Sequence, residues 1–201
     1  LHEGPAIRLM EASKYQDYLS RQKREVMGRC GLVNPEDIDA YLQAGGFAAL
    51  KKAVTQMTAE KVVEQVKQAE LRDRGPEARN TAMAWEGYRK GSHLPQYLVA
   101  IRTGGSSEAW AERTLLEGDP FALIEGMAIT AYALGGVSRG VIYLPSAYKP
   151  LAFRRMDRAI KAAQARRFLG RDMLGSPFSF DLEIRETAGE VKDGTIGAHD
   201  A

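Results

Sequence analysis

The sequence predicts an α/β fold in which short N-terminal helices precede a parallel, Rossmann-like three-layer sheet with crossover helices. Three short apolar segments, at 97–101, 141–144 and 178–185, have the composition of strands. Two longer segments between them, 119–134 and 151–169, carry apolar residues at helical spacing. Strands that alternate with helices in this way pair in parallel, and the helices cross over the sheet.

The first third of the chain has the pattern of a series of short helices, and we predict a helical preface at 1–57 followed by an α/β domain at 58–201. Asn34-Pro35-Glu36-Asp37 is a helix start, because Asn caps, Pro suits the first helical position and acids complement the helix dipole. Gly45-Gly46 ends that helix. Thr58 opens a further helix.

The later elements have equally clear signals. Asp119-Pro120 begins a helix, and Gly135-Gly136 ends it. Segment 178–185 alternates between apolar and polar residues, which is the pattern of a half-buried strand. Ligands of parallel sheets bind beyond the carboxyl ends of the strands, so the loops there are the expected site.

Net charge is only +2, but it is unevenly distributed. Residues 149–171 hold eight basic residues against the single acid Asp157, a net +7, so the rest of the chain carries −5. A solvated helix face is one interpretation, and a surface for nucleic acid, an anionic membrane or an acidic partner subunit is another. No nucleic-acid module accompanies the basic segment, so no nucleic-acid partner is predicted. The candidate partner surface consists of Arg154, Arg155, Arg158, Lys161, Arg166 and Arg167.

Composition excludes several kinds of site. With Cys30 as the single cysteine, the chain forms no internal disulfide and no Cys₄ zinc or iron–sulfur site, and we predict no metal site. The three histidines are scattered along the sequence. No apolar run reaches the roughly 20 residues that span a bilayer, and no signal peptide is visible. We therefore predict a cytoplasmic protein without a transmembrane segment.

One block carries a family resemblance. The stretch Leu-Leu-Glu-Gly-Asp-Pro-Phe-Ala-Leu-Ile-Glu-Gly-Met at 115–127 resembles the flavin- and NADH-binding subunit of complex I-type NADH dehydrogenases and of related soluble hydrogenases and formate dehydrogenases. The resemblance extends over about the last two thirds of the chain and, more loosely, to 22–50. It implies FMN as cofactor, NADH as hydride donor, and other subunits of a redox complex as partners that accept the electrons.

The resemblance also places the cofactor loops, the first of which is 71–85. Relatives carry a glycine-rich run there, whose backbone N–H groups close on the flavin phosphate and ring. This chain keeps Arg72, Arg74, Gly75 and Thr81 of the family pattern. Residues with side chains replace the glycines at Asp73, Pro76, Ala78 and Ala82.

The other cofactor loops retain even less of the family pattern. In 100–108 only Gly105 matches, and Ile101 stands where relatives have Asn. In 187–197 Gly189 remains, but the aromatic residue and both carboxylates of the family are replaced. After the strand at 141–144, a family glutamate is lost as well. The vestigial cofactor-binding residues are thus Arg72, Arg74, Gly75, Thr81, Gly105 and Gly189, with no catalytic residue among them.

Three functions are compatible with these residues. The first is a non-catalytic structural or docking subunit of a redox complex, because the family scaffold persists while the loops expected to bind FMN and NADH lose their functional residues. The second is an active FMN-dependent NADH:acceptor oxidoreductase subunit with altered loops, which passes electrons to iron–sulfur partners. The third is a small-anion binder that uses the polar turn at 103–107.

Overall fold

A computed structural model describes Asp17 and residues 20–73, 77–91, 97–101, 108–146 and 149–187. Its sheet has three parallel strands in the order β1 (Tyr97–Ile101), β2 (Arg139–Pro145) and β3 (Asp181–Thr187). The predicted parallel α/β arrangement is confirmed. β3 begins three residues later than expected, because Phe180 forms an isolated bridge with Gly170 before the ladder with β2 starts.

Two crossovers connect the strands. Helices α6 (Glu108–Gly118) and α7 (Pro120–Ala133) link β1 to β2. A π-helical turn (Lys149–Phe153) and α8 (Arg154–Ala165) link β2 to β3. α8 is shorter than the predicted 151–169, since it starts after the π-helical turn and the chain reverses beyond its end, where Arg167 adopts a φ of 58°.

In the described part of the chain, β1 is preceded by α2 (Ile38–Gln43), α3 (Ala48–Gln56), α4 (Ala59–Gln68) and α5 (Thr81–Gly91). The cap of α2 is Asp37 and not the predicted Asn34, because the Asp37 side chain accepts from two backbone N–H groups. Thr58 caps α4 as predicted. α5 and α6 have no comparable signal in the sequence, because their apolar residues follow no clear helical stripe.

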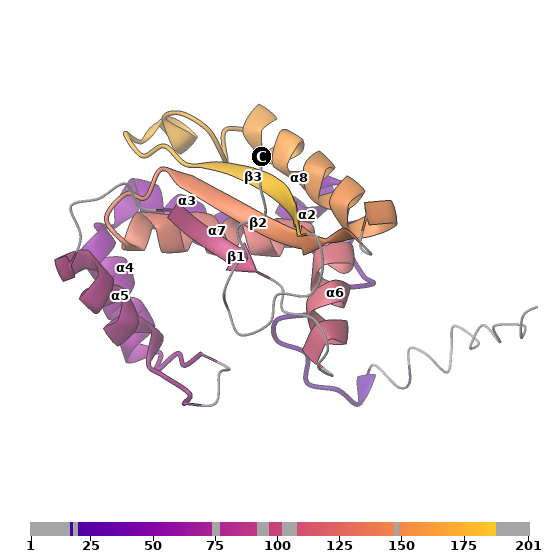
Figure 1. The fold of residues 1–201 in the computed structure, drawn as a ribbon, viewed down its shortest axis with the longest axis horizontal. Coiled ribbons are helices and arrows are strands. Elements are labelled where there is room, and N and C mark those ends of the chain that lie inside the picture. Colours follow the sequence, from indigo (N-terminus) through magenta and orange to yellow (C-terminus); the bar gives the residue numbers. More distant parts are fainter. Residues whose placement is uncertain are drawn as a thin grey trace, which may run out of the picture.

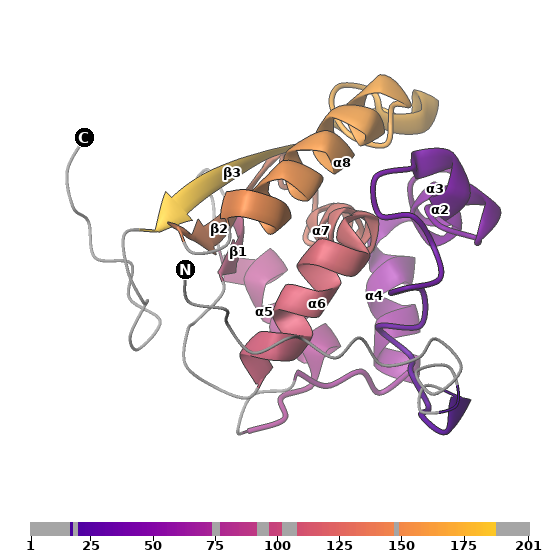
Figure 2. The ribbon, with the colours of Figure 1, turned by 90° about the vertical axis from the view of Figure 1, so that its right-hand side faces the viewer.

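The elements stack in three layers, which the two views show from perpendicular directions (Figures 1 and 2). The sheet is one outer layer, the crossover helices α6, α7 and α8 form the middle layer, and α2, α3 and α4 lie beyond them. α7 is apolar around most of its surface because it packs against helices α3 and α4 on one side and faces the sheet on the other.

The main core runs through all three layers. Tyr41, Phe47 and Leu50 of the N-terminal segment join Phe121 of α7 and Ile142 of β2 in a single buried cluster. The rings of Phe47 and Phe168 stack 4.2 Å apart. The proposed preface and the α/β domain therefore share one hydrophobic core.

The second face of the sheet has no helix layer in the described part of the chain. Tyr97 and Val99 of β1 point to that face and are 53% and 41% exposed. Among the described helices, none is both long and apolar enough to cross a bilayer.

Candidate functional site

A pocket lies at the carboxyl ends of β1 and β2, where parallel α/β sheets bind their ligands. Its volume is about 190 Å³. The walls are almost entirely apolar, and the lining is Ala100, Ile101, Glu112, Leu115, Leu116, Leu123, Ile142, Tyr143 and Leu144. Ile101 lines the pocket with a hydrocarbon side chain.

Backbone contacts join the two described ends of the loop that was predicted to hold the cofactor. Arg72 and Asn80 form an antiparallel bridge, and the Asp73 N–H donates to the carbonyl of Arg79 at 2.9 Å. One Asp73 carboxylate oxygen accepts from the Arg79 N–H at 3.1 Å. The Asp73 carboxylate therefore occupies one backbone amide of the loop.

Side chains of this loop also bind the loop itself. The Arg72 guanidinium donates to the carbonyl of Ala78 at 3.2 Å, and Arg79 forms an ion pair of 2.6 Å with Glu77. Ala78 has a φ of 42°, in the region that favours glycine. The backbone therefore makes a glycine-like turn at a residue that carries a methyl group.

Of the six predicted cofactor-binding residues, the structure describes Arg72 and Thr81. Arg72 and Thr81 lie at the two ends of the closed loop, and Thr81 is the first residue of α5. The Thr81 N–H donates to the carbonyl of Leu71, and Asn80 caps α5 by accepting from the Met83 N–H. The remaining predicted positions, Arg74, Gly75, Gly105 and Gly189, and the polar turn at 103–107 lie outside the described residues.

The basic face of α8 lies against acidic residues of the N-terminal segment. Glu36 is within ion-pair distance of Arg154, Arg155 and Arg158. These three charges lower the pKa of Glu36, although desolvation, the largest single influence, acts in the opposite direction. Arg155 also donates to the backbone carbonyl of Glu117.

Acidic side chains also pair with the basic residues toward the C-terminal end of α8. Arg166 donates to both carboxylate oxygens of Asp39, at 2.7 and 2.8 Å, and Lys161 pairs with Asp157 at 2.8 Å. Arg167 is exposed beyond the helix end. The candidate partner surface is thus a mixed-charge surface whose acids come largely from 36–39.

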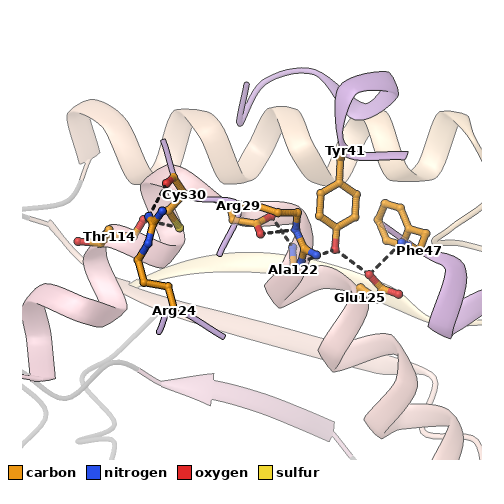
Figure 3. A network of polar contacts seen from close by, with 9 residues as sticks. Arg24, Arg29, Cys30, Tyr41, Phe47, Thr114, Ala122 and Glu125 are labelled. Atoms are coloured by element: carbon orange, nitrogen blue, oxygen red, sulfur yellow. Dashed lines mark hydrogen bonds and ion pairs between the residues drawn. The ribbon is translucent and has the colours of Figure 1, made fainter. Parts of the chain in front are cut away.

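A polar network that the sequence did not predict joins the N-terminal segment to α7 (Figure 3). Arg29 donates to the carboxylate of Asp119 at 2.8 Å, and its guanidinium lies 4.7 Å from the centre of the Tyr41 ring. Asp119 is only 3% exposed and also caps α7 by accepting from the Ala122 N–H. Desolvation raises the pKa of Asp119, while Arg29 opposes that rise.

Glu125 completes this network. One of its oxygens accepts from the Tyr41 hydroxyl at 2.7 Å and from the Phe47 N–H at 2.9 Å, and the other accepts from the Leu50 N–H at 3.2 Å. The carboxylate of α7 therefore caps the start of α3, which has no side-chain cap of its own. Because the partners are 75 to 84 residues apart in sequence, no local pattern could have revealed them.

The described residues contain no group of metal-ligating side chains. Cys30 is buried, and its thiol lies 3.8 Å from the carbonyl oxygen of Thr114. Burial raises the pKa of this thiol, so it is a weak nucleophile.

Comparisons with known proteins agree with this architecture. Residues 66–195 match the family described as the Nuo51 FMN-binding domain. The NADP-reducing hydrogenase subunit HndC of Solidesulfovibrio fructosivorans is 39% identical over 170 residues, which are 84% of this chain and 34% of that protein. An NADH-quinone oxidoreductase subunit of Escherichia coli (strain K12) is 32% identical over 156 residues, 77% of this chain and 35% of that protein.

A solved structure supports the fold. The NAD⁺-reducing [NiFe]-hydrogenase in the air-oxidized state matches with a TM-score of 0.56 and 23% identity, over 76% of this chain and 25% of that one. The chain spans about a third of the length of the curated relatives. These matches show that the chain belongs to the Nuo51 FMN-binding domain family of NADH dehydrogenase flavoprotein subunits.

Proposed function

We propose that this chain is a non-catalytic structural or docking subunit of an electron-transfer complex. The observation that carries the proposal is the closed first loop, in which the Asp73 carboxylate accepts the Arg79 N–H. A flavin phosphate bound by such a loop needs backbone amides that point away from the protein. Here the carboxylate takes up one of those donors.

Electrostatics support the same conclusion. A phosphate group at this loop would approach the carboxylates of Asp73 and Glu77, and like charges at close range repel. Arg72, one of the two basic residues that the sequence analysis assigns to the family pattern, donates to the Ala78 carbonyl instead of toward a ligand. Pro76 has no amide hydrogen to offer. The described residues do not fit an FMN phosphate, so no hydride-transfer step is assigned to them.

The pocket at the ends of β1 and β2 supports the proposal as well. A flavin ring and a nicotinamide need polar groups that fix their orientation. This pocket presents mainly aliphatic side chains, with Glu112 as its charged lining residue. Such a lining is expected of a retained scaffold whose ligand-binding groups have been replaced.

We propose that the partners are other subunits of the redox complex, and that the protein works in the cytoplasm. The exposed outer residues of α8, Arg154, Arg158 and Lys161, are the proposed contact surface. In the assembled complex, a partner's acidic side chains would compete with Glu36 and Asp157 for these cations. Such contacts weaken with added salt.

Charge reversal of this surface tests the docking role. We expect the double variant R154E/R158E to lose co-purification with the redox partner, and the wild-type complex to dissociate as salt rises. The matched control is K52E, at an exposed lysine of α3. Retention of the partner by R154E/R158E, at the wild-type level and at every salt concentration, would refute docking through α8.

A second candidate is an active FMN-dependent subunit that receives hydride from NADH. The identity of 39% to the hydrogenase subunit and the retained Arg72 and Thr81 favour it. The visible absorption spectrum of the purified protein distinguishes the two. Flavin bands at one equivalent per chain support the active subunit, and a colourless protein after incubation with FMN supports the docking subunit.

A further inference from the structure

The pocket at the carboxyl ends of β1 and β2 has the size of a small aromatic molecule. Its volume is about 190 Å³. An apolar cavity of about 150 Å³ inside a protein holds one benzene molecule, so this pocket has room for one substituted ring. Its lining comes from β1, β2, α6 and α7, and every lining residue belongs to the described part of the chain.

Hydrocarbon side chains form most of the pocket wall. Leu116, Ile142 and Leu144 are its buried members, and Leu115 and Leu123 are half-buried beside them. A ring in this pocket would contact aliphatic carbon from two helices and a strand, and each contact contributes dispersion energy. Removing the ring from water adds a favourable term that grows with its apolar area.

Two lining side chains carry polar atoms, Glu112 and Tyr143. Glu112 is exposed. The Tyr143 hydroxyl hydrogen-bonds to Arg185 of β3, and this bond raises the pKa of Arg185 together with the larger effect of the Glu183 charge. The contribution of Tyr143 to the pocket wall is therefore mainly its ring.

These groups restrict the class of ligand that fits. An anionic ligand needs a cationic counter-charge, and the described lining contains no lysine, arginine or histidine. A ligand rich in polar groups would give up its hydrogen bonds to water without replacing them. An uncharged aromatic ring loses little when it leaves water and gains contacts on several sides.

We propose that this pocket binds an uncharged, single-ring aromatic molecule, held by the aliphatic side chains of α6, α7 and β2. FMN lies outside this ligand class because it carries a charged phosphate. The ligand site thus goes beyond the docking role proposed above, and it uses a different part of the molecule from the outer residues of α8.

An NMR titration of the methyl-labelled full chain with toluene and with benzoate tests this site. The two probes have nearly the same size, but benzoate carries a carboxylate where toluene carries a methyl group. We expect toluene to shift the methyl signals of Leu116 and Leu144 saturably, with a dissociation constant of about 1 mM or below. Benzoate should bind at least about tenfold more weakly, because the pocket offers it no counter-charge.

Two variants locate the binding in the pocket. L123W fills it with a larger side chain and should abolish the toluene shifts. L32W is the matched control, because Leu32 is 71% exposed, and it should bind toluene as the wild type does. L115A enlarges the pocket and should raise the affinity for indole relative to toluene at least about threefold, a gain that a misfolded variant could not show.

The absence of saturable methyl shifts with toluene overturns the proposal. So does benzoate that binds as tightly as toluene, or an L123W variant that binds toluene as L32W does. FMN and partner subunits enter none of these titrations, so failure of the ligand site is distinguishable from failure of the proposed function.

Discussion

Glu125 shows how much one side chain contributes to this fold. Its carboxylate accepts hydrogen bonds from Tyr41, Phe47 and Leu50, and so fixes the start of α3 against α7. Removing it leaves a hydroxyl and two backbone N–H groups without their acceptor. An unpaired buried donor costs more than the net value of the hydrogen bond that satisfied it.

We therefore expect E125A to lower the free energy of unfolding by about 2–4 kcal/mol. Urea denaturation monitored by circular dichroism measures the change. E64A is the control, because Glu64 is exposed and its carboxylate accepts from the side chain of Gln68 at the surface, and its effect should stay within about 0.5 kcal/mol. Equal losses in E125A and E64A would contradict the assigned role of Glu125.

Two glycines provide a matched test of packing. A Cβ on Gly140 in β2 would lie 2.5 Å from Leu182 Cδ2 and 2.7 Å from Phe180 Cζ, whereas a Cβ on Gly126 in α7 would meet no atom within 4 Å. We expect G140A to destabilise the protein by about 1–3 kcal/mol through overpacking. G126A should stabilise it by about 0.5–1 kcal/mol through helix propensity. Thermal or urea unfolding of both variants measures this, and a G140A that is as stable as wild type would be inconsistent with the described core.

At the scale of single residues, the sequence predicts the caps better than the long-range contacts. Asp119 and Thr58 are recognisable as helix starts because a cap is a local pattern. The partner of Asp119, Arg29, is 90 residues away and carries no local signal. The closed loop around Asp73 could not be predicted either. The sequence shows that a carboxylate is present, but it does not show that the Arg79 N–H donates a hydrogen bond to it.

At the scale of elements, strands and amphipathic helices follow their periodicity. The apolar face predicted for α8 is confirmed by the burial of Met156, Ile160 and Ala163. The sequence did not reveal the partners of its basic face, since the acids that pair with that face come from 36–39. Helical periodicity shows that a face is charged, but only the tertiary fold shows what neutralises it.

The contact between Glu36 and α8 makes a pH-dependent prediction. The native pKa of Glu36 lies below its usual value of 4.5, so its contribution to stability is present above that value and is lost as pH falls through the lowered native pKa. We expect the stability difference between wild type and E36Q to shrink as the solution is acidified through this range. Urea titrations at a series of pH values provide the measurement. A difference that stays constant, or grows, on acidification would contradict the ion-pair assignment.

At the scale of the whole molecule, the N-terminal helices are part of the core. Tyr41, Phe47 and Leu50 pack against α7, so the apolar surface of α7 would face water without them. The division at residues 57 and 58 stays a prediction about organisation along the chain, and the shared core leads us to expect that the two parts depend on each other for stability.

A chain that starts at residue 58 tests this dependence. We expect it to aggregate or to lose cooperative unfolding, because burial of several large apolar side chains contributes about 1.5–3 kcal/mol each. Calorimetry and gel filtration measure both properties. A cooperative transition at the temperature of the intact chain would show instead that the α/β part folds independently.

Loss of FMN binding by this family scaffold is the central claim, and a fluorescence titration of FMN with the purified chain tests it most directly. A member of the family that carries FMN serves as the positive control in the same buffer. The closed, acidic first loop predicts no saturable quenching of flavin fluorescence at any protein concentration reached. Saturable quenching at one flavin per chain would contradict the claim, because the loop at Asp73 would then have to open around the phosphate.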